Sequence, residues 1–227
     1  MAAPTYQKST AREYFESIVV AVILALFVRT FVVQAFKIPT GSMEPNLLVG
    51  DHLLVNKFIF SPTATSPERM VLPIRDIRRG DIVVFKFPED PERDFIKRVI
   101  GLPGDTVELR QRELFINGQK VEEPYAHYLF PLSEGQESAN FDVRERYGPV
   151  TVPDRHYFMM GDNRDNSQDS RYWGFLPAHY VKGRALMIYW SFEQPTGEPS
   201  SGIAAIFNSV VSIFTGTRWG RLLHQIH

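Results

Sequence analysis

An unbroken apolar run near the N-terminus limits most strongly what this chain can fold into. The segment Ile18–Val28 carries no polar side chain, and after two further residues the apolar pattern resumes. A helix that crosses a bilayer needs roughly 20 residues, which the stretch 14–36 supplies. A helix that is apolar on every face must hide its whole surface. We therefore expect residues 14–36 to form a transmembrane anchor and residues 1–13 a cytoplasmic tail.

Two alternatives to a membrane anchor stay open for this apolar run. A cleaved signal peptide needs a small-residue cleavage site, and Gln34–Phe36 matches such a site weakly. A buried core helix would also hide an apolar surface. The flanking charges decide little, because Lys8 and Arg12 precede the run while Arg29 and Lys37 follow it. The positive-inside rule therefore favours a cytoplasmic N-terminus only slightly.

The composition of the chain excludes several classes of protein. Its 227 residues suffice for one substantial domain, and a hydrophobic share of 44% excludes wholesale disorder. The net charge of -1 disfavours nucleic-acid binding by bulk positive charge. With no cysteine, the chain has no disulfide framework, no cysteine-ligated metal and no thiol nucleophile. We expect no cofactor, no metal and no nucleic-acid partner, and the sequence leaves the oligomeric state open.

Residues 37 to about 190 read as short β-strands. The segments are rich in β-branched and aromatic residues, and Gly, Pro and Asp separate them. Asn117-Gly118 is a hairpin-turn signal. This pattern predicts a mostly β fold of antiparallel sheets that form a partly open, barrel-like core. The expected strands are Asp51–Phe58, Asp81–Phe87, Phe95–Ile100, Thr106–Leu109, Glu113–Ile116, Tyr157–Met160 and Ala185–Trp190.

The chain divides into a β core, an inserted lobe and a C-terminal segment. We expect residues 37–107 and 151–195 to form the core, with the more polar stretch 108–150 as an inserted β lobe or excursion. Residues 196–227 read as a linker followed by an amphipathic segment. Its apolar positions at 203–214 have helical spacing, but such a short helix would be only about 18 Å long. It would either lie in a membrane interface or dock on its own domain.

Two residues could do chemistry, although neither is assigned by its local pattern. Ser42 follows a glycine, where a serine is usually a turn residue, and Lys97 lies in a strand pattern, where a lysine usually faces solvent. A lysine serves as a general base only when neutral, and its ordinary pKa is about 10.4. Burial can lower that value by several units. None of the six histidines has metal-ligand spacing, while a Ser-His-Asp triad stays open because its members need not be close in sequence.

A third candidate segment, residues 161–175, alternates acidic and basic side chains. A calcium loop is one interpretation, but the arginines and Trp173, twelve positions into the loop where a glutamate is required, argue against it. A turn braced by Asp–Arg hydrogen bonds fits better. The charged residues are Asp162, Arg164, Asp165, Asp169 and Arg171.

Four segments, in this order, closely resemble the bacterial type I signal peptidases, or leader peptidases, a family of Ser–Lys dyad serine peptidases. The resemblance covers most of residues 35–190, and the middle lobe and the C-terminal segment contribute little to it. Each segment alone is moderately specific, whereas all four behind an N-terminal anchor are very specific. The segments are Pro39–Pro45, Gly50–Phe58, Asp94–Asp105 and Gly161–Gly174.

The resemblance implies a catalytic role for two of these side chains. It assigns Ser42 as the nucleophile and Lys97 as the general base, which replaces the solvent-facing interpretation of the lysine. An acyl-enzyme on Ser42 would form and then be hydrolysed. The oxyanion would be held by the Ser42 N–H and by the hydroxyl of Thr40, at a position where serine is common in the family.

The resemblance also implies supporting and substrate-binding residues. Ser167 matches a hydroxyl that orients the lysine amine, Asp162 and Arg98 match a supporting ion pair, and Asp169 with Arg171 braces the same turn or is purely structural. The residues matching two shallow apolar substrate pockets are Phe36, Ile38, Met43, Leu47, Phe95 and Ile96. Such pockets accept small residues, as at Ala-X-Ala cleavage sites.

The resemblance therefore predicts a membrane-bound endopeptidase that removes signal peptides from exported preproteins. We expect a single-pass protein of the bacterial inner membrane, in contact with the lipid bilayer, with its catalytic domain on the extracytoplasmic side. One alternative is a self-cleaving, repressor-type Ser–Lys peptidase, although the chain shows no DNA-binding helical module. Another is a non-catalytic anchored β module that binds peptides, in which Lys97 would be an ordinary strand lysine.

Overall fold

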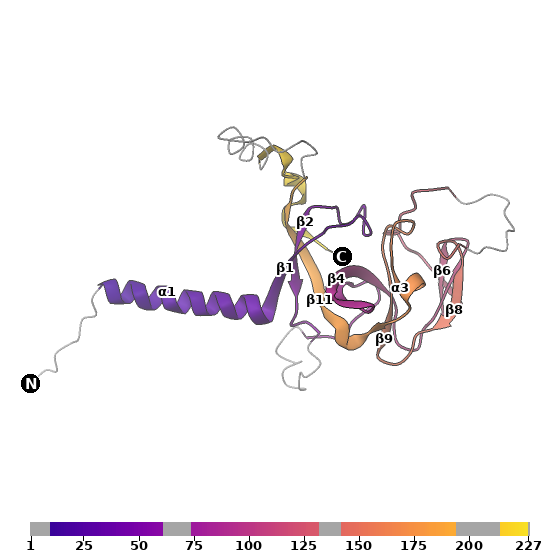
Figure 1. Cartoon of the computed structure of the whole chain (residues 1–227), viewed down its shortest axis with the longest axis horizontal. Helices are drawn as coiled ribbons and strands as arrows, with labels where there is room; N and C mark the ends of the chain where they lie inside the picture. The colour runs from indigo at the N-terminus through magenta and orange to yellow at the C-terminus, as the bar shows by residue number, and fades with distance from the viewer. Residues whose placement is uncertain (1–9, 61–73, 132–141, 194–213, 227) are drawn as a thin grey trace, which may run out of the picture.

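A long N-terminal helix projects from a mostly β body in the computed structural model of the chain (Figure 1). The structure describes residues 10–60, 74–131, 142–193 and 214–226. The β body contains two antiparallel sheets, which we call the first and second sheets. The prediction of a mostly β, antiparallel fold with an N-terminal helix is confirmed.

The N-terminal helix ends earlier than the expected range 14–36. Helix α1 spans Thr10–Phe27, a π-helical turn η1 follows at Val28–Val32, and strand β1 occupies Val33–Lys37. The last residues of the expected helix are extended because each pairs with a residue of strand β2, Asp51–Asn56. The large apolar side chains of α1 are exposed. Within the described residues, no helix has both the length and the apolar character required to span a membrane.

The first sheet carries most of the expected strands. Its path runs β1-β2-β11-β3-β4-β9-β10, and β12 pairs with β11. Among the described residues this path ends at β1 and β10, so the sheet is not a closed barrel. The remaining strands are β3 (Ile82–Phe87), β4 (Asp90–Gly101), β9 (His156–Met160), β10 (Leu176–Pro177), β11 (Val181–Ser191) and β12 (His224–Gln225).

The second sheet lies between Thr106 and Thr151, close to the range 108–150 that we expected for an inserted lobe. Its order is β7-β6-β5-β8, with β5 at Thr106–Arg110, β6 at Glu113–Ile116, β7 at Gln119–Val121 and β8 at Tyr147–Thr151. The lobe begins at Thr106 because this residue pairs with Thr151. Asn117 and Gly118 both have positive φ, at 53° and 78°, as a two-residue type I′ hairpin turn requires. The hairpin prediction is confirmed.

The two sheets meet closely at the end of β4. A Cβ atom on Gly101 would lie 2.7 Å from Val107 Cγ2 and 2.9 Å from both Phe158 Cβ and Val152 Cγ2. Only a glycine permits this approach, because real Cβ atoms do not come so near to packed side chains. Strand β4 is therefore fixed at its C-terminal end by both sheets, and the same strand carries Lys97.

The described C-terminal end docks on the first sheet. A 3₁₀ turn, η3 at Trp219–Arg221, precedes β12, which pairs antiparallel with β11. Ile226 is buried and joins the core cluster of this sheet. The predicted linker and most of the predicted short C-terminal helix, at 203–213, lie outside the described residues.

Candidate active site

Ser42 lies in the connection between β1 and β2, which we call the Ser42 loop (residues 38–50). The loop is closed at its base, because the Ile38 N–H donates to Asp51 O at 2.8 Å and the Gly50 N–H donates to Ile38 O at 3.0 Å. Within it, the Leu47 N–H donates to Met43 O at 2.9 Å, which forms one helical turn directly after Ser42. The first sheet therefore holds both ends of the segment that carries the serine.

Lys97 reaches Ser42 from β4. Its Nζ lies 2.7 Å from Ser42 Oγ, and it also donates a hydrogen bond to Ile96 O at 3.0 Å. The side chain is not solvent-facing, since the residue is only 4% exposed. Its Nζ lies 5.3 Å from the centroid of the Phe95 ring. The structure thus brings together the two residues that the resemblance assigned to catalysis, from positions 55 residues apart.

Burial changes the proton affinity of this amine. Removal from water disfavours the ammonium and lowers the pKa of Lys97 to about 8, while the negative charges of Asp169 and Asp162 act in the opposite direction. Arg171 adds a smaller lowering effect. A lysine with such a pKa is substantially neutral in mildly alkaline solution, so it can accept a proton there.

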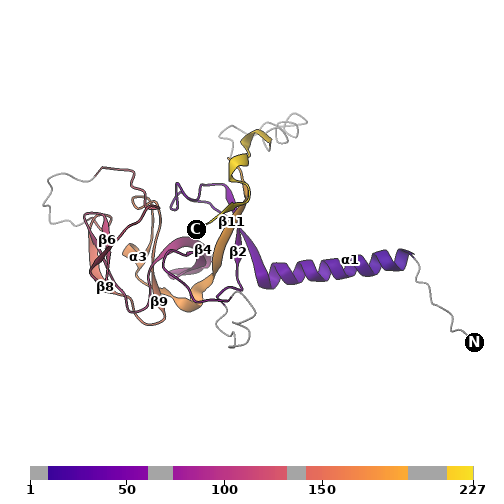
Figure 2. The same ribbon diagram turned by 180° about the vertical axis from the view of Figure 1, so that it is seen from behind.

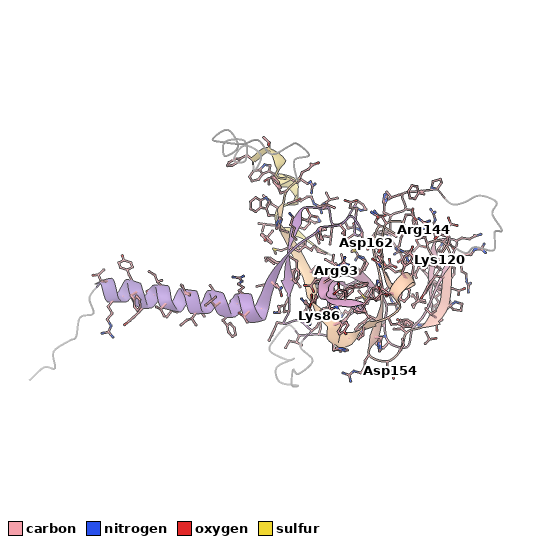
Figure 3. The ribbon with its side chains drawn as sticks, in the orientation of Figure 1. Lys86, Arg93, Lys120, Arg144, Asp154 and Asp162 are labelled. Carbon is pink, nitrogen blue, oxygen red and sulfur yellow. The ribbon has the colours of Figure 1, made fainter. Side chains whose placement is uncertain are left out.

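A buried ion pair holds the next residue of β4. Arg98 Nε donates to Asp162 Oδ1 and its Nη2 to Asp162 Oδ2, each at 2.8 Å. Asp162 lies inside the β body (Figure 3) and is 1% exposed. Asn46 of the Ser42 loop donates to the same carboxylate at 2.8 Å. The pair therefore links β4 to the loop that carries the serine.

A second buried pair braces the segment after β9. Arg171 Nε donates to Asp169 Oδ1 at 2.8 Å, and the Gly161 N–H donates to Asp169 Oδ2 at 3.0 Å. Burial alone would raise the pKa of Asp169, but the charge and hydrogen bonds of Arg171 outweigh it and the pKa is lowered. The carboxylate is thus held ionised, as a braced Asp–Arg turn requires. In the described part of the chain, no three His, Cys, Asp or Glu side chains gather as a metal site would require.

Ser167 is buried beside the same segment but does not contact the lysine amine. Its hydroxyl lies near the Asp169 carboxylate and helps to lower the pKa of that group, and the predicted bond from Ser167 to Lys97 is absent from the described structure. The amine instead uses Ser42 and Ile96 as partners. A Cβ atom on Gly161 would lie 2.3 Å from Ser167 Oγ and 2.4 Å from Ser42 O. This glycine therefore allows the serine-bearing segments to approach each other.

An open cavity of about 470 Å³ gives access to the Ser42–Lys97 pair. Thr40 stands at its exposed rim, two residues before Ser42, and the predicted substrate-binding residues Phe95 and Ile96 form part of its wall. A larger cavity, of about 730 Å³, opens on the second sheet and contains neither Ser42 nor Lys97. The remaining residues that line the smaller cavity are Pro39, Arg93, Asp94, Asn166 and Gln168.

Four of the predicted substrate-binding residues do not line this cavity. Ile38, Met43 and Leu47 are buried in the core of the first sheet, and Phe36 packs against that core. The reason is that apolar side chains beside a sheet lose most contact with water when they turn into its core. Their placement under the Ser42 loop makes them supports of the loop rather than walls of the cavity.

Two sets of contacts around the site were not predicted from the sequence, namely the partner of Arg164 and the bonds made by Asn163. Arg164 is 0% exposed and forms a two-point ion pair with Glu123, with distances of 2.7 and 2.6 Å. Asn163 donates from its side chain to Gly41 O and from its backbone to Ser42 O, both at 3.2 Å. The alternation of Asp and Arg at 161–175 indicated that Arg164 needed a partner. Nothing in the polar lobe distinguished Glu123 as that partner.

Comparisons with known proteins agree with this geometry. The model of the family described as signal peptidase, peptidase S26, matches residues 11–190. Signal peptidase I of Pseudomonas aeruginosa is 39% identical over 209 residues, which cover 81% of this chain and 74% of the relative. Signal peptidase I of Aquifex aeolicus is 32% identical over 236 residues, which cover 83% of this chain and 88% of the relative.

A crystal structure of a signal peptidase I from Enterococcus faecalis is 36% identical in sequence. The match covers 49% of this chain and 97% of the Enterococcus faecalis chain, with a TM-score of 0.39. The family match spans most of the chain, including both Ser42 and Lys97. The chain therefore belongs to the signal peptidase family, peptidase S26, and is a serine peptidase of the signal peptidase I type.

Proposed function

We propose that this chain is an endopeptidase that removes N-terminal signal peptides from exported preproteins, with Ser42 as nucleophile and Lys97 as general base. The observation that carries the proposal is the buried Lys97 amine, 2.7 Å from Ser42 Oγ at the wall of an open cavity. A sheltered lysine beside a serine hydroxyl is an arrangement that activates the hydroxyl for attack on a carbonyl.

The proposed reaction begins with neutral Lys97. Its amine takes the hydroxyl proton as Ser42 Oγ forms a bond to the scissile carbonyl carbon, and the carbonyl oxygen becomes an oxyanion. The Ser42 N–H and the Thr40 hydroxyl donate to that oxyanion. Lys97 gives the proton to the amide nitrogen as the carbon–nitrogen bond breaks, so the mature protein leaves as an amine and the signal peptide remains as an ester on Ser42. Lys97 then takes a proton from a water molecule whose oxygen attacks the ester carbon. It returns that proton to Ser42 Oγ as the ester bond breaks and the signal peptide is released.

The supporting residues act by holding this pair in place. The Arg98–Asp162 pair and the Asp169–Arg171 pair fix the two segments on either side of the lysine. The buried hydroxyl of Ser167 makes no hydrogen bond to Lys97 in the described structure, and we expect it to turn toward the amine during the reaction. These residues position Lys97 without contacting the reacting carbonyl.

The edge of β4 beside the cavity supports binding of an extended substrate. Strand β4 pairs with β9 only from Arg98 onward, so one edge of Asp94–Lys97 has no strand beside it in the described structure. A substrate can add there as an extended strand, with its backbone held by hydrogen bonds. Phe95 and Ile96 lie in the cavity wall, and we expect them to contact the substrate side chains next to the scissile bond and to favour small ones, as an Ala-X-Ala site requires.

The N-terminal helix supports attachment to the bacterial inner membrane. Large apolar side chains are exposed along α1, among them Ile18, Ile23 and Phe27. Exposure of this kind is unfavourable in water and is relieved by lipid. We place the β body on the extracytoplasmic side, where exported preproteins emerge. Attachment to the same bilayer as the substrate raises its effective concentration.

The first test is cleavage of a preprotein with an Ala-X-Ala site by the purified full chain. We expect cleavage by wild type. The cleavage rate should fall by at least about 10³-fold in Ser42→Ala, which lacks the nucleophile, and in Lys97→Met, which lacks the general base. Circular dichroism confirms that both variants are folded. Equal processing by all three proteins contradicts the dyad, and binding without cleavage by wild type favours the peptide-binding module.

The second test concerns pH. Because only neutral Lys97 accepts a proton, we expect the acylation rate to be low at pH 6 and to rise through a midpoint near the pKa of about 8. A midpoint near 10 contradicts a buried, neutral base.

The lowered pKa of Lys97 also makes the free energy of unfolding depend on pH. The folded-state pKa of Lys97, about 8, lies below its ordinary value of 10.5. Wild type therefore gains free energy of unfolding relative to Lys97→Met as pH rises from about 8 to about 10.5, by about 3 kcal/mol. Urea denaturation of both proteins across this range measures the gain.

The third test separates the hydroxyl of Thr40 from its methyl group. Thr40→Val keeps the shape but removes the oxyanion donor, and we expect kcat to fall about 10²- to 10³-fold. Thr40→Ser is the matched control, since it keeps the donor, and its kcat should stay close to wild type. Similar values for Thr40→Val and wild type contradict a role in the oxyanion hole.

The fourth test concerns the membrane. When the full chain is expressed in a bacterium, we expect it in the membrane pellet after a carbonate wash, because the apolar surface of α1 is covered by lipid. Protease added to spheroplasts should digest an epitope placed at the C-terminus. Release by carbonate contradicts anchoring, and an epitope that resists protease contradicts the proposed orientation.

A further inference from the structure

The described C-terminal segment, residues 214–226, lies against the Ser42 loop on the first sheet. Figure 2 shows the yellow C-terminal segment next to β11, and its final strand, β12, pairs with β11. It is distant in sequence from Ser42, and it contributes no side chain to the cavity at the Ser42–Lys97 pair. It nevertheless contacts the Ser42 loop directly.

Arg221 makes the main contacts between this segment and the loop. Its Nη2 donates to Asn46 O at 2.8 Å and to Asp51 Oδ2 at 2.7 Å, and its Nε lies 3.3 Å from Asp51 Oδ1. The same guanidinium therefore holds a backbone carbonyl inside the Ser42 loop and the carboxylate at its end. Arg218 adds a bond from Nη1 to Val49 O at 3.0 Å.

Asp51 is the buried centre of these contacts. Its residue is 0% exposed, and its carboxylate accepts hydrogen bonds from the Leu48 N–H at 2.8 Å and from the Ser191 hydroxyl at 2.6 Å. A buried carboxylate without a cationic partner is strongly unfavourable. Arg221 supplies the nearest positive charge, at 2.7 Å, and Arg218 Nη1 lies farther away, 3.9 Å from Asp51 Oδ1. The conformation of residues 48–51 therefore depends mainly on the charge of Arg221.

Asn46 connects these contacts to the catalytic pair. Its carbonyl accepts from Arg221, while its side-chain amide donates to Asp162, which pairs with Arg98 next to Lys97. The C-terminal segment also completes the wall of a cavity of about 420 Å³, where Ile226 lies with Asn46 and Arg98. One chain of polar contacts therefore runs from the C-terminal segment through Asn46 in the Ser42 loop to Asp162 and to Arg98, the residue that follows Lys97 in β4.

We infer that Arg221 is a positioning residue for the reaction, an inference that rests on the proposed function. It fixes the Ser42 loop through Asn46 and Asp51, so that Ser42 Oγ stays within hydrogen-bond distance of Lys97 Nζ. Without it the loop moves away from β4, water enters beside the amine and the pair separates. A displacement of about 1 Å at reacting groups can cost up to 10²-fold in rate.

The experiment measures kcat, KM and their pH dependence for full-length wild type, Arg221→Ala and Arg221→Lys with the Ala-X-Ala preprotein. We expect kcat of the folded Arg221→Ala protein to fall roughly ten- to a hundredfold, with KM nearly unchanged because the cavity walls remain. The midpoint of the pH profile should move above about 8 as Lys97 becomes hydrated. Arg221→Lys keeps the charge but cannot hold both acceptors, so its kcat should be intermediate.

Arg110→Ala is the matched control, because it removes an arginine from an exposed ion pair with Glu108 on the second sheet. It should leave kcat and the pH midpoint unchanged. Hydrogen exchange provides a readout without substrate: in Arg221→Ala the amides of Leu47, Leu48 and Gly50 should exchange faster, whereas those of the second sheet should not.

The outcomes separate this inference from the proposed function. If Ser42→Ala and Lys97→Met cleave as well as wild type, the proposed function fails. If they are inactive while folded Arg221→Ala keeps the wild-type kcat and pH midpoint, only the positioning role is overturned. Should Arg221→Ala not fold, Arg221→Lys decides, and wild-type kcat and exchange rates in that variant overturn the inference.

Discussion

The candidate active site depends on the amine of Lys97, which is buried away from water. Lys97 is enclosed by β4 and the Ser42 loop, with Nζ 2.7 Å from Ser42 Oγ. Burial lowers its pKa to about 8 although Asp169 and Asp162 lie near enough to oppose the change. Those carboxylates are each engaged by an arginine, which limits their effect on the lysine. Shelter from water and neutralised neighbours together make a basic amine possible here.

Features carried by short segments could be predicted from the sequence. The β segments were recognised by their β-branched and aromatic residues, and the hairpin at Asn117-Gly118 by two residues that tolerate positive φ. The proximity of Ser42 and Lys97 came from resemblance alone, since the strand pattern favoured a solvent-facing lysine. A period-two pattern identifies the faces of a strand but does not show which neighbour covers a given face.

Features that depend on distant partners could not be predicted. Arg164 pairs with Glu123, and Arg221 with Asp51, across 41 and 170 residues. No local pattern specifies such partners, because the sheet order brings them together. For the same reason Met43 and Leu47 were expected in substrate pockets but are buried in the core. An apolar side chain looks the same in a sequence whether it contacts substrate or supports the loop from beneath.

The junction between helix α1 and strand β1 fixes the distance between the helix and the Ser42 loop. Helix α1 continues through the π-helical turn directly into β1, and β1 leads into the Ser42 loop without any free linker. A strand of this length extends only about 16 Å. The Ser42 hydroxyl therefore lies at a fixed distance from the end of helix α1. Under the membrane attachment that we propose, this distance would limit cleavage to bonds presented at one level above the bilayer, and equally small residues exposed farther away would not reach Ser42.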